Sequence, residues 1–184
     1  MTCVVGFESK GGVWLASDSF IGTDTTKDIT VGPKWFKLGA MTIGWAGDVR
    51  TAQVIEHGTI VRPRKKDELP SRYLVSVVAR KIRATLREAG EVYKHSGGTE
   101  VADIELLITL NGHLYQMWGD CTILRCSRGM GAIGVGGPYA LGALSAMLPL
   151  PPTAPSPEAF LTRAMTLTAG LSPSVHGPFY VERA

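Results

Sequence analysis

The stretch TCVVGFESKGGVWLASDS, residues 2–19, decides the fold of this chain. Its two apolar segments, residues 3–9 and 13–19, flank the turn sequence Lys10-Gly11-Gly12. Because glycine adopts positive φ at little cost, this spacing predicts a tight antiparallel hairpin. Thr2 stands directly before the first predicted strand and one residue after Met1. Removal of that single residue would therefore give Thr2 a free α-amino group.

Apolar segments of strand length recur along the chain, separated by turn residues. The clearest second hairpin has Asn111-Gly112 at its turn, a dipeptide typical of two-residue hairpin loops. Another pair of short strands surrounds Gly39-Ala40. In chain order, strands are expected over residues 3–9, 13–19, 34–38, 41–46, 103–110, 113–118, 122–126, 132–136 and 178–182.

Two pairs of helices are predicted between these groups of strands. The first pair covers residues 48–58 and 74–89, where apolar side chains recur at helical spacing. The second pair begins at Pro138 and at Ser156, where Ser156 suits an N-cap and Pro157 suits the first helical turn. The arginines expected on the outer face of the helix at residues 74–89 are Arg80, Arg83 and Arg87.

The order of elements is strands, two helices, strands, two helices and one strand. Groups of hairpins that alternate with helix pairs do not form a parallel βαβ chain. They predict an α+β fold, a four-layer αββα sandwich of two stacked antiparallel sheets with the helix pairs outside. No internal repeat or long linker interrupts the pattern, so residues 1–184 are expected to form one domain.

Composition limits the classes of partner. Hydrophobic residues make up 45% of the 184 residues and charged residues 19%, which is typical of a globular protein. The net charge of +3 is too small to indicate a nucleic-acid partner. The basic cluster Arg62, Arg64, Lys65 and Lys66 has no interleaved aromatic residue, so it is interpreted as a solvated loop. The apolar run at residues 141–152 is too short and too rich in proline to span a membrane.

The expected location is the cytoplasm. No basic segment precedes a hydrophobic stretch at the start of the chain, so no secretory signal is expected. Three cysteines cannot all pair with one another, which fits a reducing compartment.

Sequence patterns for cofactors and metals lack the context that such sites need. The sequence GMGAIG at residues 129–134 matches the letters of a dinucleotide-binding fingerprint. However, no βαβ unit surrounds it and no acidic residue follows about twenty residues later, so it is interpreted as a turn and a closely packed strand. The four histidines have no metal-ligand spacing and are interpreted as surface or structural residues. We therefore expect neither a cofactor nor a metal.

Thr2 has the chemistry of a self-activating nucleophile. A threonine hydroxyl needs an adjacent base, and a free α-amine titrates near neutral pH, so an N-terminal threonine carries both on one residue. Such a site also needs a cation to support the hydroxyl and an anion to hold that cation. Lys34 and Asp18 are candidates for these roles, each at one end of a predicted strand. Gly47 lies at a strand-to-helix junction, where its N–H could stabilise an oxyanion.

These stretches resemble the proteasome β-subunit and bacterial HslV peptidase family of N-terminal-nucleophile hydrolases. Thr2, Asp18, Lys34 and Gly47 fall on that family's motif positions, and Ser174 falls on a supporting serine. The segment AIGVGGPYALGAL, residues 132–144, is similar to the family's Gly-Gly-Pro-Tyr strand-to-helix element. The resemblance implies a threonine-type endopeptidase without a cofactor, which cleaves peptides or unfolded proteins. It also implies a homo-oligomeric ring, which an ATP-dependent unfoldase could feed.

Two positions depart from the family pattern. Val135 stands where the family has a serine, and Leu171 where the last helix ends near an aspartate. Both family residues help to orient the threonine amine, so their loss keeps a second hypothesis open: a non-catalytic structural ring or scaffold subunit. Small-amide hydrolysis is a third alternative, although it does not fit the Gly-Gly-Pro-Tyr element.

Each candidate residue also has an ordinary structural interpretation. Thr2 could simply begin a strand, Asp18 and Lys34 could form an ion pair, and Gly47 could mark the entry to a helix. Cys3 as an alternative nucleophile would require the removal of Thr2 as well, so it is interpreted as a buried small apolar residue.

Overall fold

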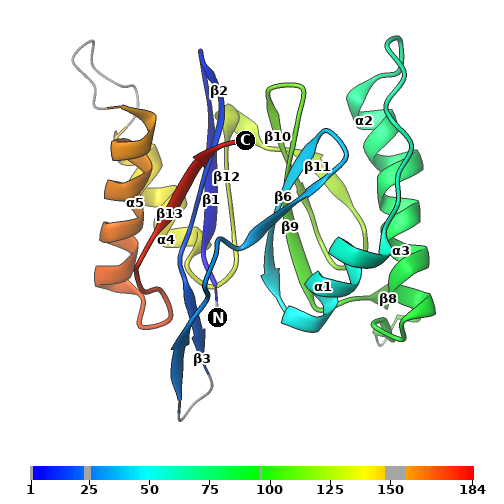
Figure 1. Ribbon diagram of the computed structural model, residues 1–184, viewed down its shortest axis with the longest axis horizontal. Coiled ribbons are helices and arrows are strands. Elements are labelled where there is room, and N and C mark those ends of the chain that lie inside the picture. The colour runs from blue at the N-terminus through cyan, green and yellow to red at the C-terminus, as the bar shows by residue number, and fades with distance from the viewer. Residues whose placement is uncertain (1, 23–25, 96, 148–155) are drawn as a thin grey trace.

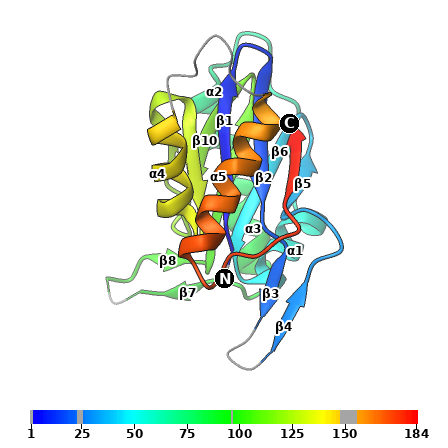
Figure 2. The same cartoon turned by 90° about the vertical axis from the view of Figure 1, so that its left-hand side faces the viewer.

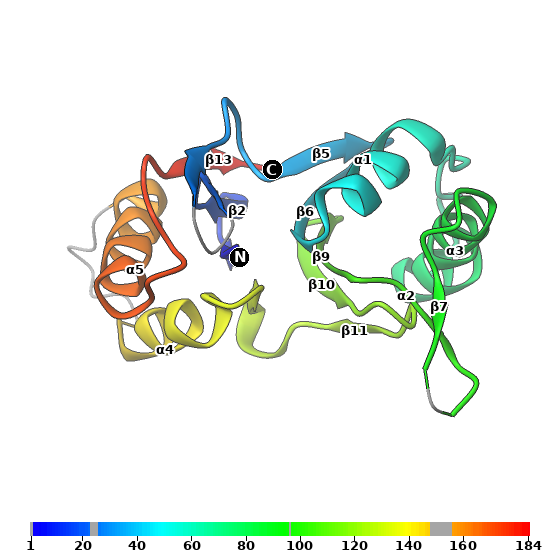
Figure 3. The same cartoon turned by 90° about the horizontal axis from the view of Figure 1, so that it is seen from below.

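Two antiparallel sheets lie face to face in the computed structural model, and helices cover the outer face of each (Figures 1 and 3). The structure describes residues 2–22, 26–95, 97–147 and 156–184. The order of layers is helices, sheet, sheet, helices. This is the four-layer αββα sandwich that the order of predicted elements indicates.

The first sheet has the strand order β12-β1-β2-β13. The predicted N-terminal hairpin forms its centre, with Val4 paired to Ser17 and Ser9 paired to Gly12. Helices α4 and α5 lie outside this sheet, as Figure 2 shows. Its elements are β1 (Val4–Ser9), β2 (Gly12–Ser17), β12 (Met130–Ile133), α4 (Gly137–Met147), α5 (Pro157–Leu171) and β13 (Tyr180–Arg183).

The second sheet has the strand order β11-β10-β9-β6-β5. Its central hairpin turns at Asn111 and Gly112, which both have positive φ, as the sequence predicts. Helices α1 and α3 cover its outer face (Figure 3). Its strands are β5 (Trp35–Leu38), β6 (Met41–Gly47), β9 (Ile104–Leu110), β10 (His113–Met117) and β11 (Ile123–Arg125). Its helices are α1 (Val49–Gly58), α2 (Pro70–Tyr73), a π-helical turn (Leu74–Val78) and α3 (Ala79–Glu88).

Three separate hydrophobic clusters fill the three interfaces between the layers. Successive side chains of a strand point to opposite faces, so Val4 packs between the sheets and Val5 packs under α4 and α5. The cluster between the sheets contains Val4, Val13, Leu15, Ala46, Leu107, Leu114 and Ile133. The larger third cluster packs the second sheet against α1 and α3. Alternation along each strand therefore determines the layer that each apolar residue joins.

Two short hairpins were not predicted from the sequence. Strands β3 (Phe20–Gly22) and β4 (Lys27–Ile29) form one, and β7 (Tyr93–Lys94) and β8 (Glu100–Val101) form the other. Figure 1 shows the β3 strand extending beyond the body of the first sheet. These strands are only two or three residues long, which is too short for an alternating pattern to be recognised.

Three details of the sequence prediction need correction. The strand expected over residues 132–136 runs instead from Met130 to Ile133, and positive φ at Gly134 ends it. The helix expected over residues 74–89 begins earlier, at Pro70. Arg83 does not face solvent freely, because it is half-buried and its guanidinium donates to the backbone carbonyl of Asp120.

The described helices were also compared with the length needed to cross a bilayer. None of the helices within the described ranges is long and apolar enough to do so. The last part of the apolar run predicted at residues 141–152 lies outside the described residues.

Candidate active site

Three segments that are distant in sequence bring Thr2, Asp18 and Lys34 together at one end of the first sheet. Thr2 precedes β1, Asp18 follows β2, and Lys34 precedes β5. The Nζ atom of Lys34 lies 3.2 Å from Oγ1 of Thr2 and 3.0 Å from Oδ1 of Asp18. Thr2 is 3% exposed and the other two residues are fully buried. The proximity expected from the sequence is therefore present.

The Lys34 ammonium also contacts the protein backbone. Its third hydrogen bond goes to the backbone carbonyl of Phe20 at 2.6 Å. A lysine ammonium has three donors and no acceptor, so Lys34 is the donor in its contacts with Thr2, Asp18 and Phe20. The direction of the bond to Thr2 follows from this. Oγ1 of Thr2 accepts from Lys34.

Backbone donors hold the Asp18 carboxylate in place. Its Oδ1 accepts from the N–H of Cys3 at 2.8 Å, and its Oδ2 accepts from the N–H of Phe20 at 3.1 Å. The backbone N–H of Asp18 in turn donates to the carbonyl of Cys3. Asp18 is thus attached to the residue that directly follows Thr2. A shift of Asp18 would move both the Lys34 ammonium and the start of β1.

Burial shifts both members of the ion pair toward their neutral forms. It lowers the pKa of Lys34 from its ordinary 10.5, and the Asp18 charge opposes this shift. It raises the pKa of Asp18 from 3.8, opposed by the Lys34 charge and by the bonds from Cys3 and Phe20. Burial also raises the pKa of the Cys3 thiol to about 12. Each charge of the pair therefore depends on the presence of the other.

Gly47 ends β6 in a conformation that requires glycine. Its φ is +121°, and an added Cβ would lie 2.3 Å from the carbonyl oxygen of Asp103. Asp48 then caps α1 by accepting from the N–H of Thr51 at 2.9 Å. The tight turn places Gly47 in the lining of the same cavity as Thr2.

The two positions that depart from the family pattern are exposed, unlike the ion pair. Val135 is 58% exposed and lines the cavity beside Thr2. Leu171 ends α5 and is 67% exposed. Ser174 is buried in the segment between α5 and β13, where its N–H donates to Oγ of Ser172. Met1, whose removal the hypothesis requires, lies outside the described residues.

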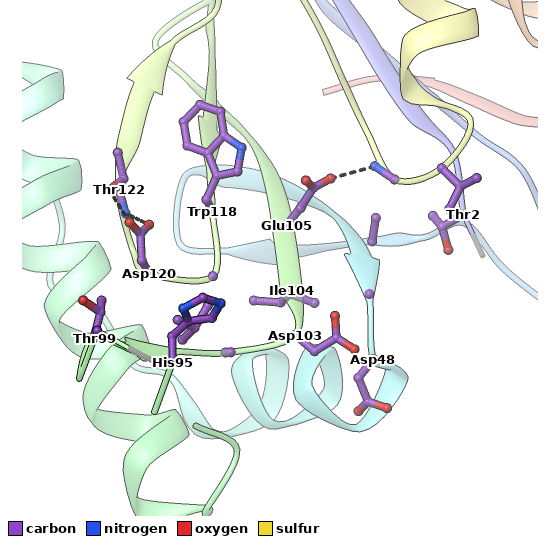
Figure 4. A pocket seen from close by; sticks show the side chains of 18 residues that line it. Thr2, Asp48, His95, Thr99, Asp103, Ile104, Glu105, Trp118, Asp120 and Thr122 are labelled. Atoms are coloured by element: carbon purple, nitrogen blue, oxygen red, sulfur yellow. Dashed lines mark hydrogen bonds between the residues drawn. The ribbon is translucent and has the colours of Figure 1, made fainter. Parts of the chain in front are cut away.

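A cavity of about 1120 Å³ opens beside Thr2 (Figure 4). Gly47, Gly134 and Val135 are among its lining residues, and Gly134 packs against Thr2. Figure 4 shows His95 and Trp118 farther from Thr2. Sequence reasoning missed the carboxylates in this lining, which are Asp48, Asp103, Glu105 and Asp120. They stand at three separate strand ends, with Asp103 and Glu105 both at the start of β9, and share no motif. The only available signal was the charged Glu105 inside an otherwise apolar strand.

Comparison with solved structures gives likenesses along the whole chain. BPH from Thiobacillus denitrificans, solved in complex with epoxomicin, has a TM-score of 0.79 and 19% identity, covering 98% of this chain and 97% of that one. HslV from Trypanosoma brucei gives 0.70 and 17%, covering 98% of both chains. The chain has the proteasome-like N-terminal-nucleophile hydrolase fold.

A third likeness extends this fold group. The Anbu complex from Pseudomonas aeruginosa, solved as a helical assembly, gives a TM-score of 0.68 and 17% identity, covering all of this chain and 81% of that one. No protein-family model and no curated protein matches the sequence of this chain. At identities below 20%, the structural likeness establishes the fold alone. The chemistry must be argued from the residues of this chain.

Proposed function

We propose that this protein is an N-terminal threonine endopeptidase. Thr2 is its nucleophile once Met1 has been removed, Lys34 and Asp18 support that nucleophile, and Gly47 donates its N–H to the oxyanion. The substrates are peptides or unfolded proteins. The chemistry needs neither a cofactor nor a metal, because the base is the α-amine of the nucleophilic residue itself.

The proposed reaction proceeds through an ester. The Thr2 α-amine takes the hydroxyl proton as Oγ1 attacks the scissile carbonyl, while the Lys34 ammonium stabilises the developing negative charge on Oγ1. The tetrahedral intermediate collapses to an acyl ester on Oγ1, and the ammonium formed at Thr2 returns the proton to the leaving amine. A water molecule, deprotonated by the same amine, then hydrolyses the ester and restores the hydroxyl.

One observation carries this proposal. The fully buried Lys34 ammonium contacts a threonine hydroxyl at 3.2 Å in addition to its carboxylate partner at 3.0 Å. An ion pair formed for stability alone would not require a threonine hydroxyl as a further partner of the ammonium. Burial makes such a pair costly, so a buried ammonium aimed at a hydroxyl supports a functional role.

The test uses fluorogenic peptides and two matched substitutions. Intact-mass measurement first establishes that Met1 is absent from the purified protein. Thr2→Ala should then lower turnover by at least about a thousandfold, because it removes the nucleophile. The control Thr166→Ala removes an exposed hydroxyl from α5 and should leave turnover unchanged. Equal turnover by the wild type and Thr2→Ala would contradict the proposal.

Assembly into a homo-oligomeric ring is part of the same proposal. The Pseudomonas aeruginosa Anbu complex forms a helical assembly, which supports oligomerisation as a property of this fold. We also propose a cytoplasmic location, supported by the free thiols of Cys3, Cys121 and Cys126. An ATP-dependent unfoldase would be the partner that delivers folded substrates to such a ring.

A non-catalytic ring or scaffold subunit is the second candidate. The exposed Val135 in the cavity favours it, because an apolar side chain there cannot hydrogen-bond the Thr2 amine or a water. Under this hypothesis, the Met1-free protein assembles but turns over no peptide. The substitution Val135→Ser should then produce no peptidase activity either.

A further inference from the structure

The cavity beside Thr2 carries an excess of negative charge. Eighteen of the described residues line it, and none of these is a lysine or an arginine, on a chain with a net charge of +3. The carboxylates in the lining are Asp48, Asp103, Glu105 and Asp120. Asp103 and Glu105 stand at the start of β9, whereas Asp48 follows β6 and Asp120 follows β10, so the fold concentrates them here.

Within the described part of the chain, no lysine or arginine forms an ion pair with these carboxylates. Asp120 accepts hydrogen bonds from the N–H and hydroxyl of Thr122 at 2.8 and 2.9 Å. Arg83 reaches the backbone carbonyl of Asp120. The cavity therefore keeps negative charge that a cationic ligand can neutralise.

Glu105 is the carboxylate tied most directly to Thr2. It lies on β9 opposite Ala46, and its Oε2 accepts from the N–H of Gly134 at 2.8 Å. Gly134 packs against Thr2 so closely that an added Cβ would lie 2.3 Å from the Thr2 carbonyl oxygen. Figure 4 shows Glu105 on the wall between Trp118 and Thr2. The backbone turn at Gly134 therefore fixes the half-buried Glu105 carboxylate beside Thr2, the proposed nucleophile.

The arrangement suits an organic cation rather than a metal ion. Among the described residues, no group of three or more histidine, cysteine, aspartate or glutamate side chains could hold a metal. The carboxylates are spread along a long cavity, and the Trp118 ring contributes an aromatic surface. Guanidinium and ammonium groups bind carboxylates and also contact aromatic faces.

We propose that this cavity binds an arginine or lysine side chain of the substrate next to the cleaved bond, with Glu105 as the principal specificity-determining residue. The inference rests on the proposed peptidase function and names its substrate class. Glu105 retains one oxygen for the incoming cation while the other accepts from Gly134. Asp48 and Asp103 in the lining add negative potential.

The test measures binding separately from turnover. Two labelled peptides, identical except for arginine or citrulline at one central position, are titrated into Met1-free Thr2→Ala protein and followed by fluorescence anisotropy. Citrulline keeps the shape of arginine but lacks its charge. We expect about tenfold tighter binding of the arginine peptide, the effect of one charge-assisted contact. Glu105→Gln should bring that ratio close to one, whereas the control Glu88→Gln, an exposed change on α3, should not alter it.

Several outcomes would overturn the inference. Equal binding of the two peptides, no binding of either, or an unchanged ratio in Glu105→Gln each contradicts it. A cleavage assay of the wild type distinguishes failure of the specificity inference from failure of the proposed peptidase function. A protein that binds the arginine peptide selectively but cleaves nothing contradicts only the peptidase proposal. One that cleaves both peptides at equal rates contradicts only the specificity.

Discussion

Lys34 donates to the hydroxyl of Thr2 from within the protein interior, with 3.2 Å between Nζ and Oγ1. Thr2 and Lys34 are 32 residues apart in sequence, and strands from both sheets bring them together. The stability of the ion pair and the proposed reactivity of the hydroxyl therefore depend on the same atom. A change at Lys34 should therefore affect both the stability of the protein and the reactivity of the Thr2 hydroxyl. Only combined substitutions can separate the two effects.

Lys34→Ala should destabilise the protein strongly. It leaves the fully buried Asp18 carboxylate without its cation, which typically costs about 3–5 kcal/mol. The double variant Lys34→Met with Asp18→Asn removes both charges, so its loss should be smaller than the sum of the single losses. Urea unfolding monitored by tryptophan fluorescence measures Lys34→Ala, the double variant and its two single variants, Lys34→Met and Asp18→Asn. Strict additivity would contradict the coupling described for this pair.

Gly47→Ala should destabilise the protein by more than about 1 kcal/mol. The residue has φ of +121°, and the new Cβ would meet the Asp103 carbonyl oxygen at 2.3 Å. Gly142→Ala is the matched control, because an added Cβ meets nothing within 4 Å on helix α4. It should stabilise the protein by about 0.5–1 kcal/mol. Thermal unfolding of the two variants should shift in opposite directions, and a shift in the same direction would count against this account of Gly47.

Glu8 links the two sheets and should contribute stability that acid removes. Its Oε1 accepts from the N–H of Leu114 at 2.9 Å, and its Oε2 lies 3.0 Å from Nδ1 of His113. Partial burial alone would raise the pKa of Glu8, but the bond from Leu114 and the contacts with His113 and Arg125 bring it below its ordinary 4.5.

The pH dependence follows from this direction. Because the folded-state pKa of Glu8 is the lower one, its contribution is complete above pH 4.5 and is lost as pH falls through the folded-state value. Glu8→Gln should therefore cost about 0.5–1.5 kcal/mol at pH 7 and show a weaker loss of stability in acid. Glu88→Gln serves as the exposed control. An unchanged acid dependence in Glu8→Gln would contradict the link.

Cys3 should be unreactive in the folded protein. It is fully buried, and burial raises the pKa of its thiol to about 12, so almost no thiolate exists at pH 8. Cys121 and Cys126 are only half-buried and should react earlier with iodoacetamide. Peptide mapping by mass spectrometry should find Cys3 labelled last, and at a normal rate only in denaturant. Early labelling of Cys3 would reopen its role as an alternative nucleophile.

Much of the fold could be predicted because its long strands carry their own signals. The hairpin around Asn111 and Gly112 combines alternating apolar residues with a turn dipeptide, and the structure contains it. The β3–β4 and β7–β8 hairpins could not be found, since strands of two or three residues give no periodicity. Local patterns identify elements that are stabilised locally, and short edge hairpins depend on their surroundings.

The candidate site likewise contains some residues that could be predicted from the sequence and one that could not. Thr2, Asp18 and Lys34 were predicted because each stands at a strand end and matches a recognised pattern. Glu105 was not predicted, because its role depends on β9 lying beside β6 and on the turn at Gly134. Only the folded chain brings these two features together.

The most direct test of the central claim is an intact-mass measurement after incubation with epoxomicin, the compound present in the Thiobacillus denitrificans BPH structure. The wild type should appear as the chain without Met1 plus one epoxomicin, and peptide mapping should place the adduct on Thr2. Thr2→Ala, treated identically, should keep its unmodified mass. A Met1-free wild-type chain that takes up no epoxomicin and turns over no peptide would contradict the claim that Thr2 is a nucleophile.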